Sequence, residues 1–490
     1  MSLLVVVVLI PVLGAAAVGA VPRRLEGWHH RVAVAAALVE LVAVLGVVAA
    51  FDPARSDIQL RAMFPWTVQV GAPSALGVDG LSLPLVGLAS LLFLSALRAS
   101  VDVRNPRSFH AWMLLLEAAV LGVLLARDWA LFYACWELTL VPSFVLVARW
   151  GGPRRGAASI AFLQYTMGGS VFTLLALLGL MASAGLRTTS MDTLAEAAHR
   201  LPVDLQAIAF VGLCVGFAVK LSVFPLHGWL PLADVEASST VAMVLSGVLM
   251  KLGAYGLLRA AATLPGGAQI VAPALGALGA LGVVYGALLA WRQDDLGAVA
   301  AYGTMSHMGM VVLSIATLDP LGWVGVTQQM VAHGCSAALL FQMVGALQGR
   351  AGTRSLAAFG GLAVGAPRLA ALIAFALIGS TALPGLAGFP GELYAVLALL
   401  ERWPWAVVPG LLGGLIWAAA AVRALDRVLL GPVRGALVGV DDARGPELQA
   451  ALPLALGLLV LGVLPAALSS WGEATVRATL RAIALSAAGS

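Results

Sequence analysis

The chain is 490 residues long, and 61% of its residues are hydrophobic whereas only 11% are charged. So few polar side chains cannot cover the surface of a soluble protein of this size, and the composition therefore predicts an integral membrane protein. The formal net charge is +4, and the basic residues are dispersed along the chain rather than clustered. This pattern does not suit a polyanion, so we predict no nucleic-acid partner.

Apolar segments that cross a bilayer need about 20 residues each. We predict about fourteen such spans, centred near residues 11, 40, 89, 118, 138, 171, 216, 247, 279, 307, 335, 384, 415 and 460. Residues 51–80 form the longest stretch between two spans, and we expect an irregular external cap there. The C-terminal segment from Trp471 onwards is too short and too polar for another span, which predicts an interfacial amphipathic helix.

Arginine is distributed unevenly among the loops. It concentrates in the loops that join span 1 to 2, span 3 to 4 and each later odd-numbered span to the next, for example at Arg23, Arg24, Arg31, Arg104, Arg107, Arg154, Arg155, Arg350 and Arg354. Because positively charged loops stay on the cytoplasmic side, we expect both termini on the non-cytoplasmic side of the membrane.

The sequence carries no signal for a cofactor or a metal. Cys135, Cys214 and Cys335 all lie in apolar segments, without a CxxC pair, so disulfide, zinc and c-type haem sites have no support. No Walker A, GxGxxG or metal-binding motif is present. We therefore predict no site for NADH, ATP, flavin or an iron–sulfur cluster, and any driving force must come from another protein.

Two predicted spans are interrupted by proline and glycine. Span 7 contains VKLSVFPLHGWLP and span 12 contains TALPGLAGFPGELY, and each places one ionisable group, Lys220 or Glu392, beside the interruption. Interrupted helices at matching positions in two halves are typical of inverted-repeat transporters, although proline and glycine are common in membrane helices generally. We predict two inverted five-helix repeats.

The corresponding domain organisation has four parts. Residues 1–109 hold the first three spans and the external loop, and residues 110–262 form the first repeat. Residues 263–430 form the second repeat, and residues 431–490 hold the last span and the amphipathic tail.

Six ionisable side chains lie inside apolar segments: Glu40, Glu117, Glu137, Lys220, Lys251 and Glu392. Each charge at the bilayer centre costs at least about 2.5–3.5 kcal/mol, which marks these residues as functional candidates. Only two of the 28 basic residues are lysines, and both are in this set. Unlike arginine, a buried lysine can release its proton.

Glu137 and Lys220 are natural partners for a proton switch, because an opposite charge that approaches or withdraws changes how tightly each group holds its proton. The alternative is a static ion pair that fixes helix packing. Glu117 could support this pair or admit protons. Glu40 lies outside either repeat, and a contact with another subunit suits it as well as a proton role.

The second half contains a candidate proton relay. Lys251 lies at the boundary between the halves, and His307 and His333 fall between it and Glu392 in chain order. Histidine titrates nearest neutrality, which favours a relay over hydrogen-bonded packing. His227, just after the interruption in span 7, could assist Lys220 or only satisfy backbone groups that the interruption frees.

Five motifs carry a resemblance to a known family. They are FYACWELTLVPSFVLVARWGG, FAVKLSVFPLHGWLP, GVLMKLGAYGLLR, AYGTMSHMGMVVLSIAT and LPGLAGFPGELY. In this order they resemble the antiporter-like subunits of respiratory complex I, in particular subunit M of bacterial NADH-quinone oxidoreductase, the counterpart of mitochondrial subunit 4.

The resemblance implies a fourteen-helix subunit of the membrane arm in a bacterial plasma membrane, with one proton pathway. In that family the glutamate at Glu137 pairs with the lysine at Lys220. The lysine at Lys251 links the half-channels through histidines like His307 and His333, and the glutamate at Glu392 serves the exit. The implied partners are the L-, N- and K-like subunits of the membrane arm, and the resemblance implies that the redox chemistry takes place in other subunits.

Two features bear on the type of subunit. Glu392 suits subunit M, because the L and N subunits and the Mrp-type cation/proton antiporters carry lysine there. The family segment WLPDAHTEAPT reads WLPLADVEASST in this chain, with Leu232, Asp234 and Ser238 at altered positions. The leading expectation is a non-redox, proton-translocating subunit of an NADH-quinone oxidoreductase. An Mrp-type antiporter subunit and the membrane subunit of a hydrogenase or carbon-uptake complex are the alternatives.

Overall fold

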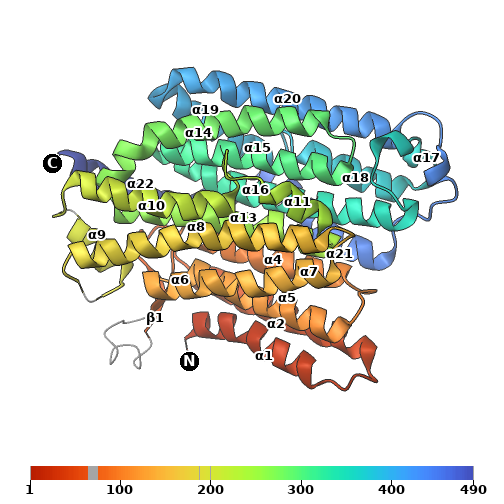
Figure 1. Ribbon diagram of the computed structural model, residues 1–490, viewed down its shortest axis with the longest axis horizontal. Coiled ribbons are helices and arrows are strands. Elements are labelled where there is room, and N and C mark those ends of the chain that lie inside the picture. Colours follow the sequence, from red (N-terminus) through yellow and green to blue (C-terminus); the bar gives the residue numbers. More distant parts are fainter. Residues whose placement is uncertain (1, 64–74, 187, 199, 489–490) are drawn as a thin grey trace.

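The computed structural model describes residues 2–63, 75–186, 188–198 and 200–488. Long helices lie side by side in one bundle, which the chain crosses from α1 at one edge to α20 at the other (Figure 1). Within the described residues, twelve helices are long and apolar enough to cross a membrane, and two shorter apolar helices accompany them. The prediction of an all-helical membrane protein is confirmed.

The N-terminal part contains α1 (Leu3–Ala20), α2 (Glu26–Ala50), β1 (Gln59–Met63), β2 (Ala75–Val78), α4 (Leu83–Ala99), α5 (Pro106–Leu125), α6 (Trp129–Leu138), α7 (Leu140–Trp150), α8 (Arg155–Ser183) and α9 (Met191–Ala198). The middle part contains α10 (Val203–Leu221), α11 (Trp229–Glu236), α12 (Ser239–Val244), the π-helical turn η1 (Leu245–Leu249), α13 (Met250–Thr263), α14 (Pro265–Arg292), α15 (Leu296–Ala316) and α16 (Pro320–Ala351).

The C-terminal part contains the 3-10 turn η2 (Leu356–Ala358), α17 (Leu362–Gly365), α18 (Pro367–Gly379), α19 (Gly388–Arg402), α20 (Pro404–Leu429), the 3-10 turn η3 (Gly435–Leu437), α21 (Gly445–Val463) and α22 (Ala466–Ala488). Helices α13, α15 and α16 are almost entirely buried, whereas α2, α8 and α20 expose many large apolar side chains. The central helices therefore carry the buried polar groups, and the outer ones suit contact with lipid.

Both interruptions predicted from proline and glycine are present. α10 ends at Leu221, and α11 continues along the bundle from Trp229 (Figure 1). The carbonyl groups at such a helix end lack intrahelical partners, and here the indole Nε1 of Trp229 donates a hydrogen bond to the carbonyl of Val219 at 2.8 Å. At the second interruption, between α18 and α19, the indole Nε1 of Trp417 donates to the carbonyl of Ser380 at 3.0 Å.

Two further irregularities were not predicted. The fifth span is divided at Thr139 into α6 and α7, three residues before Pro142. The eighth span contains the π-helical turn η1 directly before α13. π-Helical turns inside α-helices are rare and frequently accompany functional sites.

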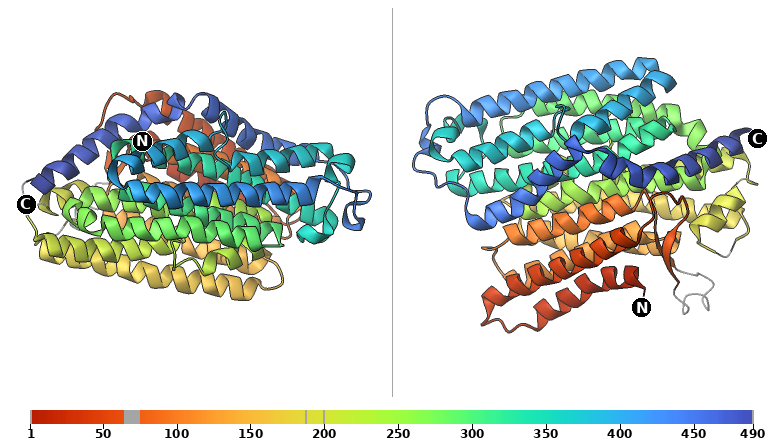
Figure 2. Two further views of the ribbon diagram at one scale, coloured as in Figure 1. Left: turned by 90° about the horizontal axis from the view of Figure 1, so that it is seen from above. Right: turned by 180° about the vertical axis from the view of Figure 1, so that it is seen from behind.

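A hairpin and a long helix lie at one end of the bundle. β1 and β2 pair in antiparallel fashion, so the described part of the predicted irregular cap contains strands. The C-terminal helix is longer than predicted, since α22 begins at Ala466, and it packs against α4, α13, α14 and α16 (Figure 2). Gly80 allows this packing, because a Cβ atom there would lie 2.0 Å from the carbonyl oxygen of Trp471.

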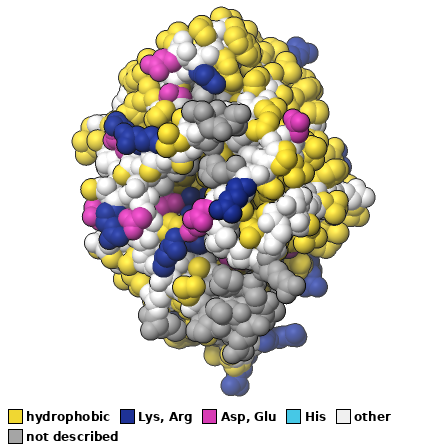
Figure 3. All heavy atoms as spheres, turned by 90° about the vertical axis from the view of Figure 1, so that its left-hand side faces the viewer, with side chains coloured by type: hydrophobic (Ala, Val, Ile, Leu, Met, Phe, Trp, Pro, Cys, Tyr) yellow, Lys and Arg dark blue, Asp and Glu magenta, His cyan; other side chains and the backbone are white. Residues whose placement is uncertain are grey.

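The same end carries many of the exposed charges. Figure 3 views the bundle from this end, where charged side chains lie on the end face and hydrophobic side chains extend around much of its margin. Both chain ends lie toward this side of the molecule (Figure 1). This arrangement matches a bundle whose sides contact lipid and whose ends contact water.

Candidate functional site

Lys251 lies at the centre of the bundle, one residue into α13, and its side chain is only 1% exposed. Its Nζ donates hydrogen bonds to the carbonyl of Ser246, within the turn η1, and to Nδ1 of His333 at 2.7 Å. The local backbone therefore provides an acceptor for the ammonium group.

His333 on α16 leads to the second half of the chain. Its ring centroid lies 5.1 Å from that of His307 on α15, and both side chains are buried. Nδ1 of His307 lies 3.6 Å from Oε1 of Glu392 on α19. Gln329 connects the same two groups, with its Nε2 at 3.3 Å from Nδ1 of His307 and 3.4 Å from Oε1 of Glu392.

The series Lys251–His333–His307–Glu392, which we call the central axis, brings together four residues that the sequence singled out. Amine, imidazole and carboxyl groups all exchange protons. Lys251 is hydrogen-bonded to His333, His307 lies 3.6 Å from Glu392, and the two imidazole rings between them have centroids 5.1 Å apart. A proton can be passed along such a series by small side-chain movements.

Lys220 lies at the end of α10 and is 1% exposed. Its Nζ donates to Oγ1 of Thr139 at 2.5 Å and lies 4.1 Å from the ring centroid of Trp136. A cation near the carboxyl end of a helix is stabilised by the helix dipole, and a desolvated cation over an aromatic face gains about 2 kcal/mol or more. The fold thus stabilises the ammonium group with neutral partners.

Glu137 lies near the end of α6 and accepts a hydrogen bond from the hydroxyl of Ser170 on α8. It interacts electrostatically with Lys220, but among the described residues no direct ion pair joins the two side chains. The hydrogen-bond partner of Lys220 is Thr139. The expected partnership of Glu137 and Lys220 is therefore present as an electrostatic interaction without a direct ion pair among the described residues.

Glu117 and Glu40 form a separate carboxylate pair on α5 and α2. Both are fully buried, and they interact electrostatically. The hydroxyl of Ser90 on α4 donates to Oε1 of Glu40 at 2.9 Å. Because the carboxyl group of Glu40 faces α4 inside the bundle, it lies away from the outer surface on which a subunit contact would form.

His227 lies apart from the central axis. Its half-buried ring stacks on Phe224, with centroids 5.9 Å apart, and meets Tyr285 at 5.5 Å. These contacts pack the segment between α10 and α11 against Tyr285 on α14. A packing role accounts for them.

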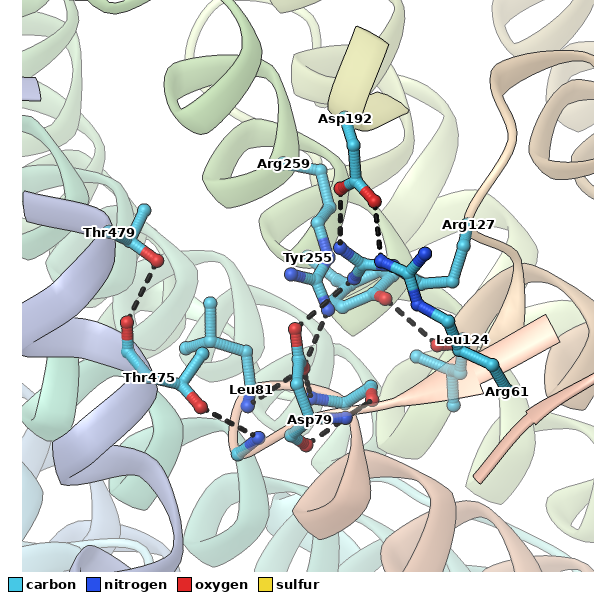
Figure 4. Close-up of polar contacts among 12 residues, drawn as sticks. Arg61, Asp79, Leu81, Leu124, Arg127, Asp192, Tyr255, Arg259, Thr475 and Thr479 are labelled. Carbon is cyan, nitrogen blue, oxygen red and sulfur yellow. Dashed lines mark hydrogen bonds and ion pairs between the residues drawn. The ribbon is translucent and has the colours of Figure 1, made fainter. Parts of the chain in front are cut away.

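A charged cluster that the sequence did not single out lies at the hairpin end of the bundle (Figure 4). Asp79 accepts from Arg259 at 2.7 Å and from Arg127 at 3.1 Å, and all three side chains are buried. Burial alone opposes ionisation of Asp79, but attraction to Arg259 and Arg127 outweighs it and holds the pKa of this carboxyl well below its usual range. Arg259 lies two turns beyond Lys251 on α13, so the cluster lies near the carboxyl end of the helix that carries the central lysine.

Comparison with known proteins identifies the family. The family model described as "NADH:quinone oxidoreductase/Mrp antiporter, TM" matches residues 126–416. This range includes Glu137, Lys220, Lys251, His307, His333 and Glu392, whereas Glu40 and Glu117 precede it. The chain belongs to this family.

Relatives and solved structures agree with this assignment. NAD(P)H-quinone oxidoreductase chain 4 1 of Synechococcus sp. (strain JA-3-3Ab) is 37% identical over 474 residues, covering 94% of this chain and 89% of the relative. A chain of respiratory complex I from Thermus thermophilus with bound NADH has a TM-score of 0.89 at 29% identity, covering 98% of this chain and 99% of that one. The resemblance to antiporter-like complex I subunits is confirmed.

A chain of the Mrp complex from Dietzia sp. DQ12-45-1b has the same fold, with a TM-score of 0.86 at 20% identity, covering 99% of this chain and 100% of that one. At this identity the likeness concerns the fold alone. The family fold is therefore shared by complex I and Mrp structures, and the functional assignment depends on the site.

The sequence analysis did not predict several polar residues that contact the candidate site. Thr139, Ser170, Ser246 and Gln329 are neutral residues of a kind that is common in membrane helices, and no charge marks them. Asp234 was noted only as a departure from the family segment, yet it is buried on α11 and accepts a hydrogen bond from the hydroxyl of Ser246.

Proposed function

We propose that this chain is the proton-translocating chain 4 or M-type subunit of a quinone-reducing NAD(P)H dehydrogenase complex related to complex I. The observation that carries the proposal is the central axis. Its four proton-exchanging groups extend from the boundary of the two halves to the interruption between α18 and α19. Ionisable groups cost free energy inside a membrane, and they typically mark the pathways of ions or protons.

The subunit moves protons and takes no part in electron transfer. In the resting arrangement Thr139, Trp136 and the field of Glu137 stabilise the ammonium group of Lys220. When conformational change driven by the other subunits weakens that stabilisation, Lys220 gives up its proton toward Lys251. His333 and His307 then carry a proton to Glu392, from which it leaves.

The architecture that accompanies this function has about fourteen membrane crossings. Residues 110–262 and 263–430 form two inverted five-helix repeats, flanked by residues 1–109 and 431–490, with both termini on the non-cytoplasmic side of a bacterial plasma membrane. In support, each half contains one of the two interruptions predicted from proline and glycine, and there the indole of Trp229 or Trp417 donates a hydrogen bond to a backbone carbonyl. The arginine-rich loops support the sidedness.

The partners are other membrane-arm subunits, of the L, N and K types, together with the subunits that oxidise the electron donor. The likeness to a chain of Thermus thermophilus complex I over almost the whole length supports this environment. Relatives named NAD(P)H-quinone oxidoreductase chain 4 support the same position in the complex.

The test uses the whole complex reconstituted in lipid vesicles. Lys251→Ala should lower proton uptake driven by NAD(P)H oxidation by about tenfold or more, since the step loses its central carrier. Glu473→Gln is the control, because Glu473 is exposed on α22 and its ion pair is with the neighbouring, exposed Arg477.

Wild-type proton uptake in Lys251→Ala would contradict the proposal. Vesicles in which the complex exchanges Na⁺ or K⁺ for H⁺ without an electron donor would indicate an Mrp-type antiporter instead. Electron transfer to an artificial acceptor, measured in parallel, checks that each variant complex is assembled.

A further inference from the structure

Asp234 is the one buried carboxyl group close to Lys251 that the central axis leaves unused among the described residues. It lies on α11, two residues before that helix ends at Glu236, and it is 2% exposed. Its Oδ2 accepts a hydrogen bond from the hydroxyl of Ser246, the same residue whose carbonyl accepts from Nζ of Lys251. Asp234 and Lys251 also interact electrostatically.

Ser246, a residue of the π-helical turn η1, therefore contacts a carboxyl group through its hydroxyl and an amine through its carbonyl. Oδ1 of Asp234 has no hydrogen-bond partner among the described residues. A buried carboxylate oxygen without a hydrogen-bond partner costs free energy. This carboxyl group can therefore take up a proton more readily than a carboxylate whose two oxygens are both hydrogen-bonded. Glu236, by contrast, has a full set of partners.

The carboxyl end of α11 leads from Asp234 to the end of the bundle that carries the arginine-rich loops. Glu236 accepts from the backbone N–H of Arg154 at 2.8 Å and from its Nε at 3.3 Å, and Arg154 is largely exposed. Arg354 donates to the carbonyl of Val235 at 2.5 Å. These contacts fix the short helix from its outer end, so that Asp234 stands between the water-exposed loops and Lys251.

We infer that Asp234 is a second proton-input group of the central axis, which charges Lys251 from the arginine-rich end independently of Lys220. Asp234 takes a proton from water at that end. For transfer, the O–H of Ser246 turns from Oδ2 of Asp234 toward Nζ of Lys251, so that the hydroxyl gives its own proton to the neutral amine and its oxygen receives the proton of Asp234. Asp234 is then an anion beside an ammonium group, and transfer from Lys251 to His333 returns the pair to its starting state.

This role places an acidic group at each end of the axis. Asp234 on α11 belongs to the first half and Glu392 on α19 to the second, and Lys251, His333 and His307 lie between them. The inference rests on the proposed function, because the axis must conduct protons for an input to matter. It also assigns a function to Asp234, one of the positions at which the segment WLPLADVEASST departs from the family segment.

The experiment compares four variants of the whole complex in vesicles: Asp234→Asn, Asp234→Glu, Asp102→Asn and Lys251→Ala. Asp102 is exposed in the loop before α5 at the same end of the bundle, so its neutralisation is the matched control. Proton uptake driven by NAD(P)H oxidation is measured with electron transfer to an artificial acceptor as the check on assembly. We expect Asp234→Asn to lower proton uptake about tenfold or more, Asp234→Glu to recover most of it, and Asp102→Asn to match the wild type.

A redox-induced infrared difference spectrum provides a readout that a purely structural role would not change. The carboxyl C=O band of Asp234 should be present in the wild type and in Asp102→Asn, and absent in Asp234→Asn. Normal uptake in Asp234→Asn, beside loss in Lys251→Ala, would overturn this inference alone. Equal loss in Asp234→Asn and Asp234→Glu, or a spectrum that Asp234→Asn leaves unchanged, would also overturn it. Normal uptake in Lys251→Ala would overturn the proposed function itself.

Discussion

Thr139 allows the energetics of the Lys220 site to be tested without altering a charge. Its hydroxyl accepts the 2.5 Å hydrogen bond from Nζ of Lys220. A hydrogen bond to a charged group contributes about 1.5–3 kcal/mol. Thr139→Val keeps the shape of the side chain and removes that acceptor, so the ratio of charged to neutral Lys220 should change by a factor of about ten to a hundred, at about 1.4 kcal/mol for each factor of ten.

The stacking of Lys220 on Trp136, with Nζ 4.1 Å from the ring centroid, remains in this variant. We therefore expect a partial defect, with proton uptake per NAD(P)H oxidised reduced several-fold, and a more severe defect in Lys220→Ala. Thr139→Ser is the control, because serine keeps the hydroxyl group. The assay is proton uptake by vesicles that contain the reconstituted complex, at matched rates of electron transfer to an artificial acceptor.

Two results would refute the reasoning. Wild-type uptake in Thr139→Val would mean that the hydroxyl does not control the charge of Lys220. An equal defect in Thr139→Ser and Thr139→Val would mean that the backbone division at this position matters and the hydroxyl does not, since the hydroxyl of Thr139 also donates to the carbonyl of Trp136 at 2.7 Å.

Two other substitutions test Glu392 at the end of the central axis and Asp79 in the charged cluster at the hairpin end. Glu392→Lys should abolish most proton uptake, because it sets a cation beside His307 where the axis needs an acceptor. Wild-type proton uptake in Glu392→Lys would show that the sign of the charge is unimportant at this position. Asp79→Asn should lower the stability of the purified complex by about 3–5 kcal/mol in thermal unfolding, because Arg127 and Arg259 lose their buried counter-ion. Since the pKa of Asp79 is lowered in the fold, its contribution is complete above the unfolded pKa of about 3.9 and is lost only as the pH falls toward the folded value. The deficit should therefore be constant between about pH 5 and pH 9, and a strong pH dependence there would contradict this account.

The parts of the site that could be predicted are those whose presence in a membrane is costly. Lys220, Lys251 and Glu392 stand out because an isolated charge in an apolar segment needs a functional reason. The interruptions after Leu221 and Gly379 could be predicted because proline cannot donate the backbone hydrogen bond that a helix requires. The free-energy cost of each such charge or proline arises from its own helix, so the sequence alone reveals it.

The parts that could not be predicted depend on tertiary packing. Lys220 is hydrogen-bonded to Thr139 and forms no ion pair with Glu137 among the described residues, and no sequence pattern sets this choice of partner. Asp234 looked like a loop residue because the segment after Trp229 departs from the family, and only the fold buries it beside Ser246. Asp79 lies at a span end, where charges are unremarkable, and its burial arises from the packing of α22 and of Arg259 against it.

Backbone irregularity coincides with Lys220, Lys251 and Glu392 in this bundle, and one physical reason explains the coincidence. A continuous helix engages every carbonyl group in its interior, so it has no backbone acceptor to offer a buried cation or a passing proton. Lys220 lies at the end of α10, Thr139 at the division between α6 and α7, and Lys251 directly after η1, with its Nζ on a carbonyl of that turn. Glu392 is the fifth residue of α19, close to an amino-terminal end that favours negative charge. The interruptions are therefore part of how each charge is tolerated, and straightening one should trap its group in a single protonation state while leaving the rest of the bundle folded.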